Sequence, residues 1–171
     1  KSAITSAANG KTTGWPRTAP LSSRIPSSTS TSPRTRTVTP RTRLVFVETI
    51  ANPRTQVADL AGIGEVCARH GLVYVVDNTM TSPWLFRPST VGASLVVNAL
   101  TKYIGGHGNA LGGSVTDTGL FDWTRYPAIH DAYKGANPKL WAVTQIRKKG
   151  LRDWGGTLSA EQAHHLSAGA E

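Results

Sequence analysis

Apolar and β-branched residues gather in four short runs after residue 43, and each run predicts a β-strand. LVFVE (44–48) and LVYVV (72–76) are continuous apolar runs, the pattern of strands buried on both faces of a sheet. LVVNA (95–99) predicts a third strand and GGSVT (112–116) a fourth. We therefore expect a parallel or mixed α/β sheet.

A helix is predicted between the first two strands. Leu60, Ile63 and Cys67 lie at helical spacing, Asp59 is placed to cap the helix at its start, and Gly71 to end it. A strand, a helix and a strand within about 33 residues form a βαβ unit, so the two strands should be parallel with a right-handed crossover.

Two more helices are predicted downstream. One covers residues 138–149 and ends at Gly150. The other starts at Ser159, with Gln162 in the position of a capping box, and is expected to run to Glu171. A helical pattern that reaches the last residue suggests a piece of a longer protein.

Residues 1–43 have a different character from residues 44–171. Ser, Thr, Pro and Arg dominate the first segment without any apolar period, so it is predicted to be disordered. Three interpretations stay open: a stretch with no evolved structure, such as an out-of-frame segment; an organelle transit peptide, which its prolines oppose; or a polyanion-binding arm.

Charge follows the same division. Residues 1–43 hold eight Lys or Arg and no acidic residue, a net +8, whereas residues 44–171 hold eleven basic and ten acidic residues, 11 − 10 = +1. The folded part therefore has no excess of positive charge for binding nucleic acid. We expect no nucleic-acid partner.

The single cysteine, Cys67, excludes an internal disulfide framework and a cysteine-rich metal site, and a reducing, cytoplasmic compartment is expected. No apolar run approaches the ~20 residues that cross a bilayer, so we expect a soluble chain without a membrane partner. The chain begins with Lys1 and shows no apolar signal core, so no secretory address is visible.

Three polar residues follow the predicted strands: Asn52, Asp77 and Lys102. Alone, each has an ordinary explanation as a turn residue, a loop cap or a surface lysine. Together, at the carboxyl edge of one sheet where ligands bind, they suit pyridoxal phosphate (PLP). A desolvated lysine amine can act as the nucleophile, and a carboxylate can pair with the pyridinium nitrogen.

A Rossmann-type NAD enzyme is disfavoured because GGHGNALGG (105–113) follows a lysine instead of the first strand.

VETIANP (47–53), VVDNTMTSP (75–83) and LTKYIGGHGNALGG (100–113) resemble consecutive motifs of the cystathionine γ-synthase and O-acetylhomoserine sulfhydrylase family, the PLP enzymes of Cys/Met metabolism. The likeness runs from about Thr42 to Glu171 and covers the middle of a full-length member. It implies part of a type I (aminotransferase-like) large domain, truncated before the C-terminal domain, in a homo-oligomer. The implied reaction is γ-replacement or γ-elimination on an activated homoserine or cystathionine-like amino acid, with a sulfur nucleophile.

The resemblance also implies roles for five residues. Lys102 would bond the cofactor covalently and shuttle protons, and Asp77 would pair with the ring nitrogen. Thr79 would lie against the ring, Asn52 would reach the phenolic oxygen or the substrate carboxylate, and Thr101 would bind the phosphate. No metal is implied, and His107 receives no chemical role.

Departures from the family pattern lower the expected activity. Ala99 stands where the family usually has a phosphate-binding serine, and residues 1–43 offer neither the glycine-rich phosphate turn nor the tyrosine that stacks on the ring. The neighbouring subunit's Tyr and Arg and the C-terminal arginine are also missing. We expect weak or no turnover. The alternative is a non-catalytic fragment that associates with intact relatives through exposed sheet edges and apolar surface.

Overall fold

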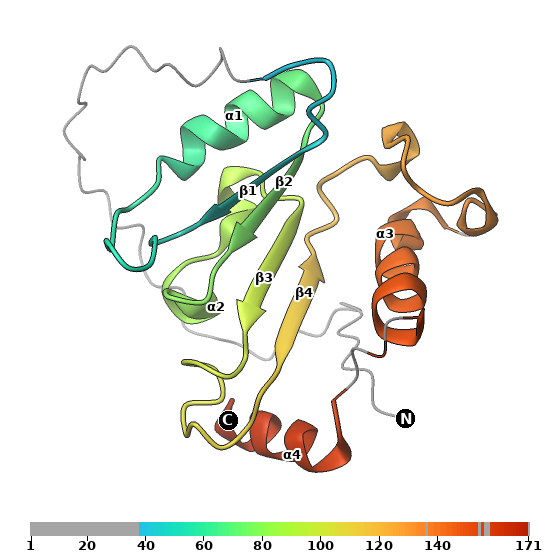
Figure 1. Ribbon diagram of the computed structural model, residues 1–171. Coiled ribbons are helices and arrows are strands. Elements are labelled where there is room, and N and C mark those ends of the chain that lie inside the picture. Colours follow the sequence, from blue (N-terminus) through green and yellow to red (C-terminus); the bar gives the residue numbers. More distant parts are fainter. Residues whose placement is uncertain (1–37, 136, 154, 156–157, 171) are drawn as a thin grey trace, which may run out of the picture.

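A four-stranded mixed sheet forms the centre of the protein (Figure 1). The computed structural model describes residues 38–135, 137–153, 155 and 158–170. The strands lie in the order β1 (Leu44–Glu48), β2 (Val73–Asp77), β3 (Leu95–Ala99) and β4 (Gly113–Asp117). The first three are parallel, and β4 is antiparallel to β3. The predicted α/β sheet is confirmed. Residues 1–37 of the segment predicted to be disordered lie outside the described residues.

Helix α1 (Leu60–His70) connects β1 to β2 and covers one face of the sheet. The carboxylate of Asp59 accepts the N–H of Gly62 at 3.0 Å, which confirms the predicted N-cap. Gly71 takes the left-handed conformation, with φ 62°, and ends the helix. The buried residues of this face are Leu60, Cys67, Leu72, Tyr74, Val76, Ala93 and Val96.

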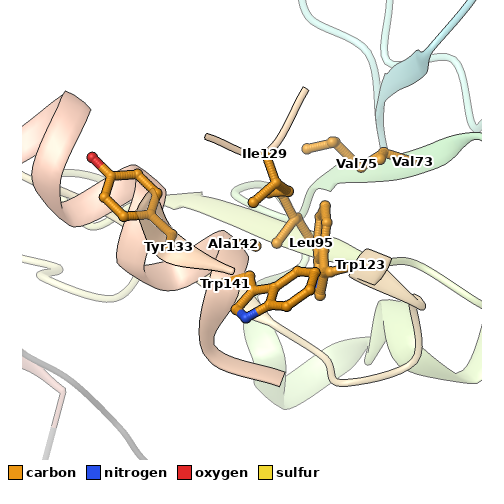
Figure 2. Close-up of a cluster of buried hydrophobic side chains, with 8 residues drawn as sticks. All are labelled: Val73, Val75, Leu95, Trp123, Ile129, Tyr133, Trp141 and Ala142. Carbon is orange, nitrogen blue, oxygen red and sulfur yellow. The ribbon is translucent and has the colours of Figure 1, made fainter. Parts of the chain in front are cut away.

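The opposite face of β2 and β3 is covered by the chain that follows β4 (Figure 2). The buried cluster there consists of Val73, Val75, Leu95, Trp123, Ile129, Tyr133, Trp141 and Ala142. The indole N–H of Trp123 donates to Asp117 at the end of β4. Strand β2 is therefore buried on both of its faces, as its apolar run predicted.

Strand β1 is not buried on both faces, so that prediction is wrong. Leu44 is 45 % and Phe46 56 % exposed, while Val45 and Val47 pack toward α1. The physical reason is position, because β1 is the outer strand and the covering chain reaches only β2 and β3 on the other face. An apolar sheet face is thus left open beside β1.

Short helices fill the connections. Between β2 and β3 lie α2 (Ser82–Leu85) and the 3₁₀ helix η2 (Pro88–Val91), and after β4 come the 3₁₀ helices η3 (Trp123–Arg125), η4 (Asp131–Tyr133) and η5 (Pro138–Leu140).

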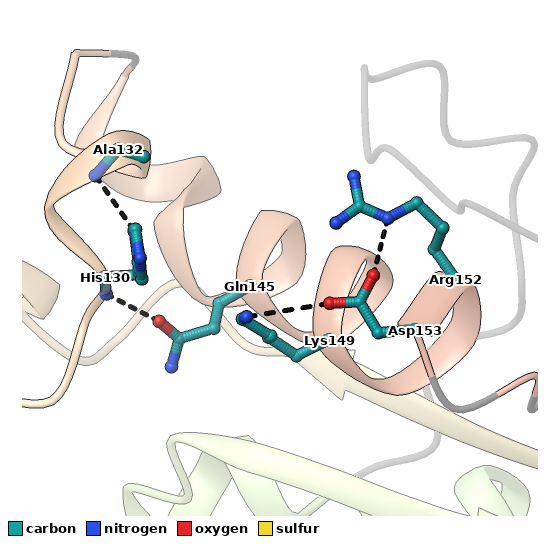
Figure 3. A network of polar contacts seen from close by, with 6 residues as sticks. All are labelled: His130, Ala132, Gln145, Lys149, Arg152 and Asp153. Carbon is teal, nitrogen blue, oxygen red and sulfur yellow. Dashed lines mark hydrogen bonds and ion pairs between the residues drawn. The ribbon is translucent and has the colours of Figure 1, made fainter.

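The helix predicted over residues 138–149 consists of η5, α3 (Trp141–Gln145) and the π-helix η6 (Ile146–Arg152). Its predicted end at Gly150 is wrong, since Gly150 does not take the left-handed conformation that ends a helix. Asp153 contacts Lys149 at 3.6 Å and Arg152 at 2.6 Å around this last turn (Figure 3). In the middle of this helical stretch, at the end of α3, the side-chain oxygen of Gln145 accepts the His130 N–H at 2.7 Å.

Helix α4 (Ala160–Gly169) lies across the turn that follows β3. The hydroxyl of Ser159 accepts the N–H of Gln162 at 3.1 Å, which confirms the predicted start. The helix ends at Gly169, so the expectation that it runs on to the last residue is wrong. Leu166 is buried against Leu100 and Ala110 of the turn.

Candidate active site

The carboxyl ends of β1, β2 and β3 meet at one edge of the sheet (Figure 1). Asn52 follows β1 by four residues, Asp77 is the last residue of β2, and Lys102 follows β3 by three residues. The parallel topology therefore brings the three predicted residues to one edge, where α/β sheets bind their ligands.

Asp77 lies on the sheet face that turns away from α1. Side chains alternate along a strand, so Asp77 shares this face with Val73 and Val75. Its carboxylate is partly buried and accepts the N–H of Thr79 at 2.9 Å. A carboxylate can accept further donors, so this contact leaves capacity for a protonated ring nitrogen.

A chain of hydrogen bonds links Asp77 to the lysine turn. The Thr79 hydroxyl accepts the N–H of Ala99 at 2.8 Å, and the carbonyl of Ala99 accepts the N–H of Lys102 at 3.1 Å. With the bond from Thr79 to Asp77, these contacts tie the backbone of the lysine turn to the end of β2. The residues Asp77 and Lys102 thus follow neighbouring strands at one edge of the sheet.

Lys102 lies in a tightly wound turn that covers residues 100–105, and it is exposed. The N–H of Gly106 donates to the carbonyl of Lys102, and that of Gly105 to the carbonyl of Leu100, both at 2.8 Å. Gly106 and Gly108 have φ of 70° and 66°, which favours glycine. The glycines therefore serve the winding of the turn.

Thr101 and Asn52 are already engaged in backbone contacts. The Thr101 hydroxyl accepts the N–H of Gly112 at 3.0 Å and donates to its carbonyl at 3.3 Å. A phosphate would have to compete with Gly112 for this hydroxyl. Asn52 is exposed, and its own N–H donates to the carboxylate of Glu48 at 2.9 Å.

The edge is open to solvent. A hollow of about 850 Å³ lies at the opposite edge, near Gly71 and Arg125, and another of about 710 Å³ lies beside Phe46 and Glu48. Neither is lined by Asp77 or Lys102. A carboxylate, an amine and hydroxyl groups are the kinds of group that the ring end of PLP uses, whereas Thr101 is the one predicted phosphate ligand at the edge.

Other chemistries find less support in the described part of the chain. It contains no group of three or more His, Cys, Asp or Glu side chains arranged to hold a metal ion. Cys67 lies on the buried side of α1, facing the sheet, and this burial raises the pKa of its thiol to about 11, which keeps it protonated. Within the same residues, no helix has the length and apolar character needed to cross a membrane.

Sequence reasoning missed two contacts of this edge. The bond from Ala99 to the Thr79 hydroxyl depends on strand register, which the sequence does not state. The bond from the Asn52 N–H to the carboxylate of Glu48, the register partner of Asp77, is the second, and the family resemblance gives Glu48 no role. The only signal in the sequence was that Glu48 and Thr79 lie within the motifs at 47–53 and 75–83.

Known proteins resemble this chain in sequence. The family model for Cys/Met metabolism PLP-dependent enzymes matches residues 20–171. A sulfhydrylase of Fusarium oxysporum f. sp. lycopersici is 38 % identical over 144 residues, which cover 75 % of this chain and 33 % of that protein. The chain thus spans about a third of the length of the curated relatives it matches.

Two solved structures share the fold. The O-acetylhomoserine sulfhydrylase of Wolinella succinogenes has a TM-score of 0.72 and 35 % identity, covering 80 % of this chain and 38 % of that one. An O-acetylhomoserine (thiol)-lyase of Campylobacter jejuni has a TM-score of 0.70 and 28 % identity, covering 80 % and 37 %, and contains a pyridoxyl-lysine monophosphate residue. The chain belongs to the Cys/Met metabolism family of PLP-dependent enzymes.

Proposed function

We propose that this chain carries part of the PLP site of an enzyme that replaces or eliminates the γ-substituent of an activated homoserine, such as O-acetylhomoserine, with a sulfur compound as nucleophile. The observation that carries the proposal is the hydrogen-bonded path from the Asp77 carboxylate through Thr79 and Ala99 to Lys102. This path joins the backbone of the lysine turn to the end of the strand that carries Asp77, which supports a shared site for the two residues.

Each residue has a defined task in this proposal. PLP, when bound, draws electrons from the bonds at the α-carbon of an amino acid. Asp77 keeps a proton on the facing ring nitrogen through its negative charge. Lys102 Nζ anchors the cofactor and moves a proton, while Thr79 and Asn52 orient the ring and the substrate, and Thr101 binds the phosphate.

Cofactor binding by this chain is proposed to be weak and turnover low or absent. Lys102 and Asn52 are exposed, so little of the edge excludes water. Ala99 offers no hydroxyl, and that of Thr101 is occupied by Gly112. One missing charge-assisted hydrogen bond to the phosphate costs roughly 1.5–3 kcal/mol.

Titration with PLP tests the proposal. We expect the full chain to develop the visible absorbance of lysine-bound PLP, and borohydride reduction followed by peptide mass spectrometry to locate the adduct on Lys102. Lys102→Ala should abolish both signals, whereas the exposed Lys139→Ala should leave them unchanged. An adduct spread over several lysines, or kept in Lys102→Ala, would refute the assignment.

A second candidate function is association with an intact relative without catalysis. It is favoured by Phe46, which is 56 % exposed on the open face of β1, the outer strand of the described sheet. Size-exclusion chromatography with the Wolinella sulfhydrylase tests it. Co-elution that Phe46→Ser removes would support this function, and independent elution would exclude it.

The assembly and location of the protein are also proposals. A family-length chain is proposed to form a homo-oligomer. Because its one cysteine calls for no disulfide, the proposed compartment is the cytoplasm. Light scattering of a family-length protein and cell fractionation would test the two statements.

A further inference from the structure

Glu48 stands beside Asp77 at the carboxyl edge of the sheet. The two are register partners on the parallel strands β1 and β2, and alternation places both on the face away from α1. Neighbouring strands are about 4.8 Å apart. Two carboxylates at one register position are not what strand pairing favours, since like charges that face each other repel.

A hydrogen bond to the following loop explains why a carboxylate stands at position 48. Glu48 Oε2 accepts the backbone N–H of Asn52 at 2.9 Å. The contact spans four residues and joins the strand end to the residue proposed to orient the cofactor ring or the substrate.

The rest of the loop is fixed at its base. The N–H of Thr49 donates to the carbonyl of Asp77 at 2.9 Å, and Ile50 forms an isolated antiparallel bridge with Val57. Asn52 is exposed in the turn that follows, which two backbone hydrogen bonds of Ala51 close, from its N–H to the Gln56 carbonyl at 2.8 Å and from the Thr55 N–H to its carbonyl at 2.7 Å. Within the described residues, Glu48 adds the side-chain contact that bonds the Asn52 N–H directly to the end of the strand.

We infer that Glu48 is a positioning residue, which holds Asn52 where it can reach the bound cofactor or substrate. The inference rests on the proposed function, and it adds a residue to which the family resemblance gave no role. Glu48 acts through Asn52, so its effect should vanish when the Asn52 side chain is removed. The positioning of Asn52 should also survive when Glu48 is replaced by a neutral side chain that keeps an acceptor oxygen.

The first test measures the dissociation constant of PLP for the full chain by absorbance titration. Glu48→Ala should weaken binding about tenfold, equivalent to about 1.4 kcal/mol. Glu48→Gln keeps an acceptor oxygen and should stay within about twofold of the unaltered chain. The control Glu65→Ala, on the exposed side of α1, should change nothing.

A double-mutant cycle then separates positioning from a general structural effect. In the Asn52→Ala background, Glu48→Ala should weaken PLP binding less than about twofold, because coupled residues are not additive. A full tenfold loss in that background would overturn the inference. Glu48→Gln as damaging as Glu48→Ala would also overturn it, since the charge would then be what matters.

A measurement without PLP distinguishes failure of this inference from failure of the proposed function. In the cofactor-free chain, amide exchange at Asn52 should accelerate about tenfold in Glu48→Ala and remain slow in Glu48→Gln. If the unaltered chain forms no adduct at Lys102, the proposed function fails, while this exchange rate still decides whether Glu48 holds the loop. Unchanged exchange in Glu48→Ala would refute the positioning role by itself.

Discussion

The hydroxyl of Thr79 accepts the backbone N–H of Ala99 at 2.8 Å, two residues beyond the last paired residues of β2 and β3. A side chain thus extends the ladder of a parallel sheet past the point where the strands separate. Because the Thr79 N–H also donates to Asp77, the same residue holds the carboxylate and the backbone that leads to Lys102.

Thr79→Val should therefore loosen the lysine turn. Valine has nearly the same shape but no acceptor, so the Ala99 N–H loses its partner at a cost of about 1 kcal/mol in the free energy of unfolding. Amide exchange at Ala99 should rise together with this loss, as measured by NMR and urea denaturation. Thr79→Ser keeps the hydroxyl and should behave like the unaltered chain, and slow exchange in Thr79→Val would contradict this view of the contact.

Ala99→Ser should strengthen PLP binding. The family resemblance places a phosphate-binding serine at this position, and one hydrogen bond to a charged group contributes roughly 1.5–3 kcal/mol. The dissociation constant of PLP should fall at least about tenfold in an absorbance titration. Ala99→Val adds volume without a donor and serves as the control, so equal effects of the two variants would show that packing, not a phosphate contact, is responsible.

Local sequence patterns predicted the positions of the strands and of α1 better than the burial of these elements in the fold. The apolar runs marked all four strands of the described sheet to within a residue, and Asp59 and Gly71 marked both ends of α1. The exposure of Phe46 could not be predicted, because it depends on which strand lies at the edge and how far the chain after β4 reaches. The continuation of the helix through Gly150 likewise depends on tertiary context.

For the candidate site, the placement of the residues was predictable, but the contacts between them were not. Topology alone brought Asn52, Asp77 and Lys102 to one edge, because parallel strands end together. The hydrogen bonds that connect them depend on register and on turn geometry, so neither the Thr79 contact nor the Glu48 contact was predictable. The roles of the five site residues with the cofactor stay predictions until the titrations above are made.

Gly169→Ala should detach the end of α4 from the lysine turn. A Cβ at Gly169 would overlap the carbonyl oxygen of Gly105, a backbone atom that cannot rotate away. Overpacking of this kind costs typically 1–3 kcal/mol in the free energy of unfolding, measured by urea denaturation. Because Gly105 belongs to the same turn as Lys102, PLP binding should weaken as well. Gly135→Ala, which meets no atom within 4 Å, should alter neither quantity.

Stability should decline at alkaline pH because of Cys67. Burial raises the pKa of this thiol to about 11 from 9.0, so ionisation favours the unfolded chain. The stabilisation is fully present below about pH 9 and is lost as the pH rises toward 11, by at most about 3 kcal/mol. Tyr74, whose buried hydroxyl donates to the Leu60 carbonyl, also has a raised pKa and contributes in the same direction.

Cys67→Ala should lower the free energy of unfolding at pH 8 by leaving a cavity, yet it should flatten the fall of this free energy between pH 9 and 11 in urea titrations. An equally steep fall in this variant would assign the alkaline loss to Tyr74 and other groups.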